Sequence, residues 1–115
     1  MLAEKSISEL HNLLKKKEIR PCEIVEDIFK RIEQVENKVK AYITLTHELA
    51  LKQAEEAEKK ILSGEITILT GIPLAIKDNI STEGIRTTCA SRVLHNYIPP
   101  YDAFVIKQLK KEGAI

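Results

Sequence analysis

The stretch Gly71-Ile72-Pro73-Leu74-Ala75-Ile76-Lys77-Asp78-Asn79 carries the strongest indication of the fold class. It contains an unbroken apolar run, Ile72 to Ile76, which is too short for a lone helix and is typical of a strand buried on both faces. Pro73 stands near the start of the run, where a strand tolerates a missing N–H. The run therefore predicts a core strand and an α/β fold.

Lys77 follows this run directly. In open α/β sheets, ligands bind at the carboxyl ends of the strands. Burial there would disfavour the charged form of a lysine, and the neutral amine could then act as a general base or nucleophile near neutral pH. The alternative is a strand that reaches the surface and leaves Lys77 in water. The pattern alone leaves both interpretations open.

Residues 78–101 form a long stretch without strong periodicity, which is typical of a functional loop or lid. Small polar side chains in it could line an amide-sized pocket or serve as turn residues: Asn79, Thr82, Thr87, Thr88 and Ser91. Asp78 could orient Lys77 through a charge-assisted contact, or it could stabilise the loop. We favour the loop role for Asp78 and Asn79, because both residue types favour turns.

Composition excludes several classes of protein. A chain of 115 residues is one small domain at most, or a piece of a larger one. With 18 basic and 17 acidic residues, it has no electrostatic signature of nucleic-acid or membrane binding. Cys22 and Cys89 are far apart, and the histidines are scattered, so we expect free thiols, no metal site and a cytoplasmic location. No signal peptide and no transmembrane run is predicted.

The first part of the chain has the pattern of successive helices. Ser6-Ile7-Ser8-Glu9 is a capping box, and the stripe that follows it consists of Ile7, Leu10 and Leu14. Lys15 to Lys17 could form an RNA-facing patch or a solvated last turn, and the balanced net charge favours the latter. Pro21 fits the first position of a second helix, whose apolar face is Ile24, Ile28, Ile32 and Val35.

A short β-branched strand is predicted for residues 41–46, and a third helix begins near Thr46 or His47. Its narrow apolar stripe is Ala50, Ala54, Ala57 and Ile61, and Ser63-Gly64 ends it. We therefore expect residues 1–64 to form a helical lead-in with one short strand.

Residues 65–115 are expected to begin an α/β core. Asp102 is the predicted N-cap of a fourth helix, with Gly113 at its C′ position. The helix would bury a face made of Ala103, Val105, Ile106 and Leu109. Ala114-Ile115 looks like the start of another buried strand, which predicts a βαβ unit with parallel pairing. A domain would not stop there, so we expect the chain to be the N-terminal part of a larger α/β enzyme.

Several motifs in this second half resemble the amidase signature family. They are Gly71-Ile72-Pro73, Lys77-Asp78-Asn79, Gly84, Thr87-Thr88, Ser91, Pro99 to Ala103 and Gly113-Ala114-Ile115. The stretches Thr87 to Ser91 and Asn96 to Asp102 look like the glutamine-hydrolysing members of that family, in which Cys89 replaces the usual small residue. The resemblance implies N-terminal helices leading into the first βαβ portion of a mixed sheet that is incomplete in this chain.

By this resemblance, Lys77 matches the terminal base of a serine, cis-serine, lysine triad that cleaves amides through an acyl-enzyme. Lys77 is the only catalytic residue predicted here. The family's two serines lie in a Gly/Ser-rich segment, and no Gly-Gly-Ser-Ser-Gly-Gly occurs in this sequence. The resemblance therefore implies that the chain is inactive by itself.

The resemblance also implies partners. The substrate would be glutamine, and the ammonia would pass to the B and C subunits of an amidotransferase heterotrimer. That complex converts Glu-tRNA(Gln) to Gln-tRNA(Gln) with ATP and Mg²⁺, and this chain would meet tRNA only through the complex. No cofactor or metal ligand is predicted in this chain, which lacks a phosphate-binding loop. Two alternatives stay open: another hydrolase of the same family, and a non-catalytic helical interaction module.

Overall fold

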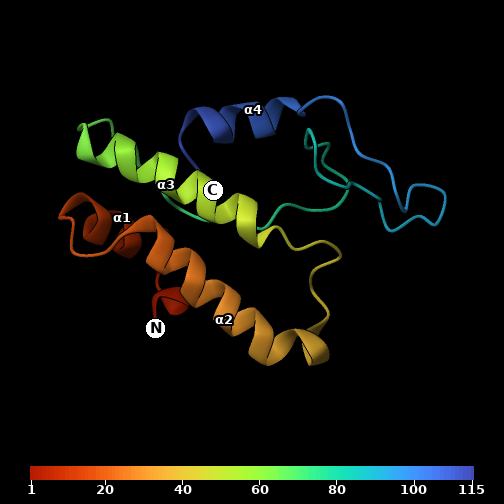
Figure 1. Ribbon diagram of the computed structural model, residues 1–115, viewed down its shortest axis with the longest axis horizontal. Coiled ribbons are helices and arrows are strands. Elements are labelled where there is room, and N and C mark those ends of the chain that lie inside the picture. The colour runs from red at the N-terminus through yellow and green to blue at the C-terminus, as the bar shows by residue number, and fades with distance from the viewer. The chain divides into compact units, whose positions relative to one another are not determined.

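The computed structural model describes residues 1–115, and all of its regular secondary structure is helical (Figure 1). Its elements are a short 3-10 helix, η1 (Leu2–Glu4), and four α-helices, α1 (Ile7–Lys15), α2 (Pro21–Val39), α3 (His47–Leu62) and α4 (Phe104–Lys111). None of the helices is long and apolar enough to cross a bilayer. The chain forms two compact units, one of Met1–Leu74 with Glu112–Ile115 and one of Ala75–Lys111. The division expected after residue 64 stays a prediction about the complete protein.

Local signals set the start of α1, as the sequence predicts. The Ser6 hydroxyl accepts a hydrogen bond from the Glu9 N–H, and the Glu9 carboxylate accepts one from the Ser6 N–H at 2.7 Å. These two bonds form the capping box and satisfy N–H groups that have no partner inside the helix. Leu10 and Leu14 are buried, whereas Ile7 is 43% exposed and lies outside the core.

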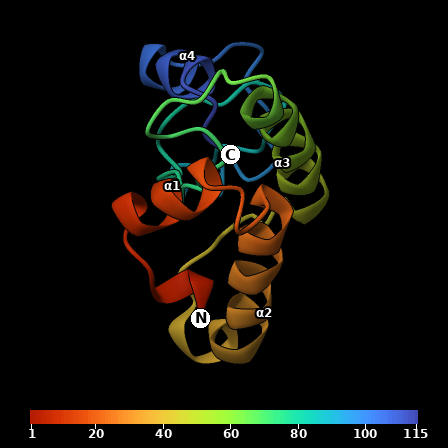
Figure 2. The ribbon, with the colours of Figure 1, turned by 90° about the vertical axis from the view of Figure 1, so that its left-hand side faces the viewer.

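The predicted start of α2 and the predicted end of α3 are also confirmed. Pro21 occupies the first turn of α2, where its missing N–H costs nothing. Ala54, Ala57 and Ile61 are the buried residues of α3. Gly64 follows that helix with a φ of +84°, a conformation in which glycine has no side-chain penalty. Helix α2 packs against both α3 and η1 (Figure 2).

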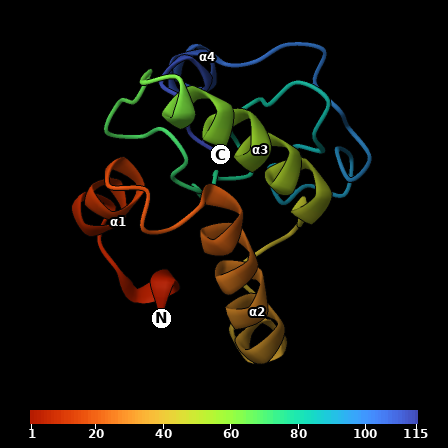
Figure 3. The same cartoon turned by 60° about the vertical axis from the view of Figure 1, so that its left-hand side comes forward.

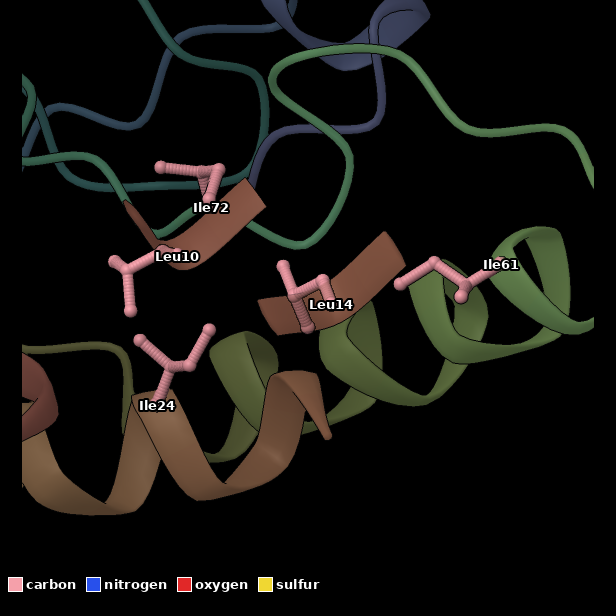
Figure 4. Close-up of a cluster of buried hydrophobic side chains, with 5 residues drawn as sticks. All are labelled: Leu10, Leu14, Ile24, Ile61 and Ile72. Carbon is pink, nitrogen blue, oxygen red and sulfur yellow. The ribbon is translucent and has the colours of Figure 1, made fainter. Parts of the chain in front are cut away.

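Helices α1, α2 and α3 and the beginning of the 71–79 stretch share one apolar core in the first unit (Figure 4). Leu10 and Leu14 of α1 lie against Ile24 of α2, Ile61 of α3 and Ile72. Full burial of a leucine or isoleucine side chain stabilises a fold by about 1.5–3 kcal/mol. This cluster therefore anchors the beginning of the 71–79 stretch to the helices.

The strand predicted for Ile72 to Ile76 is not present. Ile72 is 2% exposed, but Ile76 is 40% exposed, and the segment has no regular strand geometry. Its pairing is short: the Leu74 N–H donates to the Ile115 carbonyl at 2.9 Å, and the Ile115 N–H donates to the Ile72 carbonyl at 3.0 Å. These bonds have the slanted arrangement of parallel strands. A central strand needs a paired strand along each of its two edges. In this chain the 72–76 segment pairs only with residues 113–115 along one edge, so no βαβ sheet forms.

The strand predicted for residues 41–46 is wrong. The segment is an irregular link between α2 and α3 (Figure 3), and its Tyr42, Ile43 and Leu45 side chains are exposed. The Tyr42 N–H donates to the Glu36 carboxylate at 2.8 Å rather than to a neighbouring strand. β-Branched residues favour a strand only where a partner strand and a packing surface exist.

In the second unit, the predicted N-cap of α4 is also wrong. The Ala103 carbonyl accepts the first helical hydrogen bond, from the Lys107 N–H at 3.1 Å, so Asp102 lies one residue outside the cap. The Asp102 carboxylate instead accepts hydrogen bonds from the Glu83 N–H and the Lys110 ammonium, both at 2.7 Å. These long-range donors compete successfully for the carboxylate that the local pattern assigned to the helix end.

Candidate active site

Lys77 lies at a turn in the second unit. Its carbonyl accepts a hydrogen bond from the Ile80 N–H at 3.1 Å, which closes the turn. Its side chain is exposed and makes no hydrogen bond or ion pair. The buried setting considered for this lysine is absent here, because the strand that would carry it into a core does not form. A lysine without a partner remains in water by default.

The carboxylate of Asp78, the next residue, accepts several hydrogen bonds from this loop. One carboxylate oxygen accepts from the Thr88 N–H at 2.9 Å. The other accepts from the Thr88 hydroxyl and, more weakly at 3.4 Å, from the Ala90 N–H. The Asp78 carbonyl accepts from the Cys89 N–H at 2.8 Å. The loop-stabilising role favoured for Asp78 is therefore confirmed, and the contact with Lys77 is not formed.

These bonds hold Asp78 in its charged form. The hydrogen bond from the Thr88 hydroxyl lowers the pKa of Asp78 most, while partial burial opposes that effect. The N–H groups of Thr88 and Ala90 and the positive charge of Arg86 lower the pKa further. The net result is a pKa below the ordinary value, so Asp78 is ionised at neutral pH.

The turn that Asp78 binds has an unusual backbone. Cys89 and Ala90 have φ values of +51° and +55°, and the Ser91 N–H donates to the Thr88 carbonyl at 2.8 Å. Positive φ at both central residues is the geometry of a type I′ turn, which asparagine and glycine normally occupy. For other residues this conformation costs about 1–2 kcal/mol each. Such strain persists only where the surroundings impose it, and it is concentrated at functional sites.

The small polar residues of the loop mostly serve the loop itself. The Thr82 hydroxyl donates to the Ile80 carbonyl at 3.2 Å, and the Thr87 hydroxyl donates to the Ile85 carbonyl at 3.1 Å. Both threonines are buried, which fits the turn-residue interpretation. The side chains of Asn79 and Ser91 have no hydrogen-bond partner in this chain.

Sequence reasoning missed the bond between Asp78 and Thr88. The two residues are separated by ten positions and lie in no periodic element. Cys89-Ala90 carries no glycine or asparagine that would mark a type I′ turn. No group of three or more His, Cys, Asp or Glu side chains in the chain could hold a metal ion, and both cysteines are free thiols.

Comparison with known proteins identifies the class. The family model described as Amidase matches residues 23–115, so the chain belongs to the amidase family. It is 54% identical over 110 residues to the A subunit of glutamyl-tRNA(Gln) amidotransferase from Thermoanaerobacter pseudethanolicus. It is also 54% identical over 114 residues to the protein of the same name from Geotalea daltonii. The family predicted from the motifs is therefore confirmed.

The match covers most of this chain but a small share of each relative. The alignments span 96% and 99% of this chain, and 22% and 24% of the Thermoanaerobacter and Geotalea proteins. The solved native peptide amidase of Stenotrophomonas maltophilia matches with a TM-score of 0.90 and 28% identity. That alignment covers 98% of this chain and 24% of the amidase. This chain thus spans about a quarter of an amidase of known structure and has its fold over that part.

Proposed function

We propose that this chain is the N-terminal part of the glutamine-hydrolysing subunit of a glutamyl-tRNA(Gln) amidotransferase. The observation that carries the proposal is the 54% identity, over nearly the whole chain, to relatives of that name. Because the chain spans less than a quarter of those relatives, the activity belongs to the complete protein. The chain's own contribution is the loop that carries Lys77.

In the proposed mechanism, Lys77 is the terminal base of the triad. Its neutral amine accepts a proton from a bridging cis-serine, which takes the proton of the nucleophilic serine. That serine attacks the carboxamide carbon of glutamine, and ammonia leaves with a proton as the acyl-enzyme forms. Water then hydrolyses the ester to glutamate and regenerates the serine. Both serines would come from a Gly/Ser-rich segment that this sequence does not contain.

The proposal includes completion of the sheet. In the complete protein, we expect the short pairing of Ile72 and Leu74 with Ile115 to extend into the mixed sheet of the amidase signature fold. The slanted hydrogen bonds at 2.9 and 3.0 Å support parallel pairing at that point. Added strands would cover Ile76 and bring Lys77 to a strand end facing the serines, where burial favours a neutral amine.

The remaining steps are assigned to partners. Ammonia would pass to a complex with B and C subunits, which uses ATP and Mg²⁺ to convert Glu-tRNA(Gln) to Gln-tRNA(Gln) in the cytoplasm. The relatives are named as one lettered subunit of an amidotransferase, which supports the existence of further subunits. Glutamine hydrolysis can be measured separately from that second reaction.

Lys77→Ala in the complete protein tests this proposal. Loss of a general base typically costs about 100- to 10,000-fold in rate, so we expect a loss of glutamine hydrolysis in that range, measured as glutamate release. Lys107→Ala removes an exposed lysine of α4 in the same unit and should leave the rate unchanged. A Lys77→Ala variant with near-native turnover would show that the base assignment is wrong. Preference for another amide over glutamine would favour a different amidase.

A further inference from the structure

We propose that Asp78 is a positioning residue for Lys77: it fixes the lysine's main chain by binding the Thr88–Ser91 turn, without touching the lysine side chain. This inference rests on the function proposed above, in which Lys77 is the base. The inference concerns which residues set the orientation of the Lys77 side chain.

The Lys77 side chain has no anchor of its own. It is exposed and makes no hydrogen bond or ion pair in this chain. The direction in which its amine extends therefore depends on its main chain. Catalytic groups must be held close to the productive geometry, and an error of about 1 Å can cost about 100-fold in rate.

The main chain around Lys77 is fixed from two sides. The Lys77 carbonyl is held by the Ile80 N–H at 3.1 Å. The following residue, Asp78, is held through its carbonyl by the Cys89 N–H at 2.8 Å and through its carboxylate by Thr88 and Ala90. Four hydrogen bonds thus join Asp78 to residues 88–90. The peptide linking Lys77 to Asp78 is held through its own carbonyl by Ile80, and the residue that follows it is held by these four bonds.

The ionised form of Asp78 suits this turn because all the groups that contact its two carboxylate oxygens are hydrogen-bond donors. The Thr88 N–H, the Thr88 hydroxyl and the Ala90 N–H converge on its two oxygens. An asparagine offers one acceptor oxygen and turns an NH₂ group toward the remaining donors. The Thr88 hydroxyl can rotate to accept from that NH₂. The Ala90 N–H, which donates to both the Asp78 carboxylate at 3.4 Å and the Thr88 Oγ1 at 3.2 Å, keeps only the second acceptor. The turn at Cys89 and Ala90, with its positive φ values, then loses part of what holds it.

The experiment compares four variants of the complete protein: Asp78→Asn, Thr88→Val, Thr88→Ser and Asp102→Asn. We expect Asp78→Asn and Thr88→Val to lower kcat for glutamine hydrolysis by about tenfold or more, with KM within about twofold, because the base is misplaced while substrate binding is kept. Thr88→Ser keeps the hydroxyl and should restore kcat to within about twofold of the native value.

Asp102→Asn is the matched control for stability. Asp102 is the other aspartate of this unit that accepts both a backbone N–H and a side-chain donor. Asp102→Asn should lower Tm as Asp78→Asn does. At assay temperatures below the Tm of the variant, its kcat should equal that of the native protein. The double variant Asp78→Asn/Thr88→Val should lose no more kcat than the worse single variant, because both substitutions act on the one hydrogen-bond network of Asp78, Thr88 and Ala90.

Each outcome decides between the two proposals. If Lys77→Ala abolishes turnover while Asp78→Asn keeps kcat within about twofold, the positioning role is wrong and the catalytic role of Lys77 stands. If Lys77→Ala keeps its turnover, the proposed function fails and this inference fails with it. If Asp78→Asn does not fold, Thr88→Val against Thr88→Ser decides alone, and equal kcat values in that pair overturn the inference.

Discussion

Arg20 and Glu58 form a two-point ion pair that joins the start of α2 to α3. The Arg20 Nε lies 2.7 Å from the Glu58 Oε1, and the Arg20 Nη2 lies 3.0 Å from the Oε2. The hydrogen bond from Arg20 lowers the pKa of Glu58, and the pKa of Arg20 is raised in turn. Side chains that are 63% and 24% exposed are screened by water and salt, so the pair orients the helices more than it stabilises them.

Glu58→Gln should lower Tm slightly at neutral pH, by an amount that shrinks in high salt. The pKa of Glu58 in the folded protein lies below its ordinary 4.5, so its stabilisation is complete above that value and is lost as pH falls through the folded pKa. The Tm difference from the native protein should therefore shrink in acid. Glu55→Gln, an exposed change on the same helix, is the control. An equal difference at all pH values would contradict the ion-pair assignment.

Gly71→Ala should destabilise the first unit more than Gly64→Ala. Both glycines have positive φ, +79° and +84°, so both substitutions incur a backbone strain of about 1–2 kcal/mol. A Cβ at Gly71 would also lie 3.1 Å from the Pro21 Cγ and 3.3 Å from the Leu14 Cδ1, whereas one at Gly64 meets nothing within 4 Å. Crowding a packed site adds about 1–3 kcal/mol. Urea unfolding of the two variants measures the difference, and equal midpoints would show that Pro21 and Leu14 yield freely.

Leu14→Ala should cost about 2–5 kcal/mol in the free energy of unfolding, because the side chain is fully buried and its removal leaves a cavity. Ile7→Ala on the same helix is the control. Ile7 belongs to the same sequence stripe but is 43% exposed, so its truncation should cost within about 0.5 kcal/mol. Similar losses for both variants would mean that Ile7 is covered in the complete protein.

Asp102→Ala should free the Glu83 amide, while Asp102→Asn should keep it protected. Partial burial raises the pKa of Asp102, but hydrogen bonds from Lys110 and the Glu83 N–H outweigh it and lower the pKa overall. Asparagine retains an oxygen for the Glu83 N–H, and alanine retains none. Hydrogen exchange at the Glu83 amide distinguishes the variants. In the native protein, protection should also fall as acid protonates Asp102 below its ordinary 3.8. Fast exchange of the Glu83 amide in both variants would show that its protection depends on the ion pair of Asp102 with Lys110.

The helices of the first unit and the family could be predicted from local sequence signals. The Ser6–Glu9 box, Pro21 at the start of α2 and Gly64 after α3 act within one helical turn, so their partners are near in the chain. Ala54, Ala57 and Ile61 of the predicted α3 stripe follow the helical period and are buried, whereas Ala50 is half-buried. Lys77 was identified through the motif around it, because one exposed lysine carries no chemical signal of its own.

The pairing of the extended segments and the partners of the loop aspartates depend on contacts between residues far apart in the chain. Residues 41–46 and 72–76 have strand composition, but a strand requires a neighbour. This chain supplies only a short pairing of residues 71–74 with Gly113 and Ile115. Asp78 and Asp102 could each have served a local turn or cap. They bind Thr88 and Glu83 instead, because donors brought close by the folded chain outweigh those nearby in sequence.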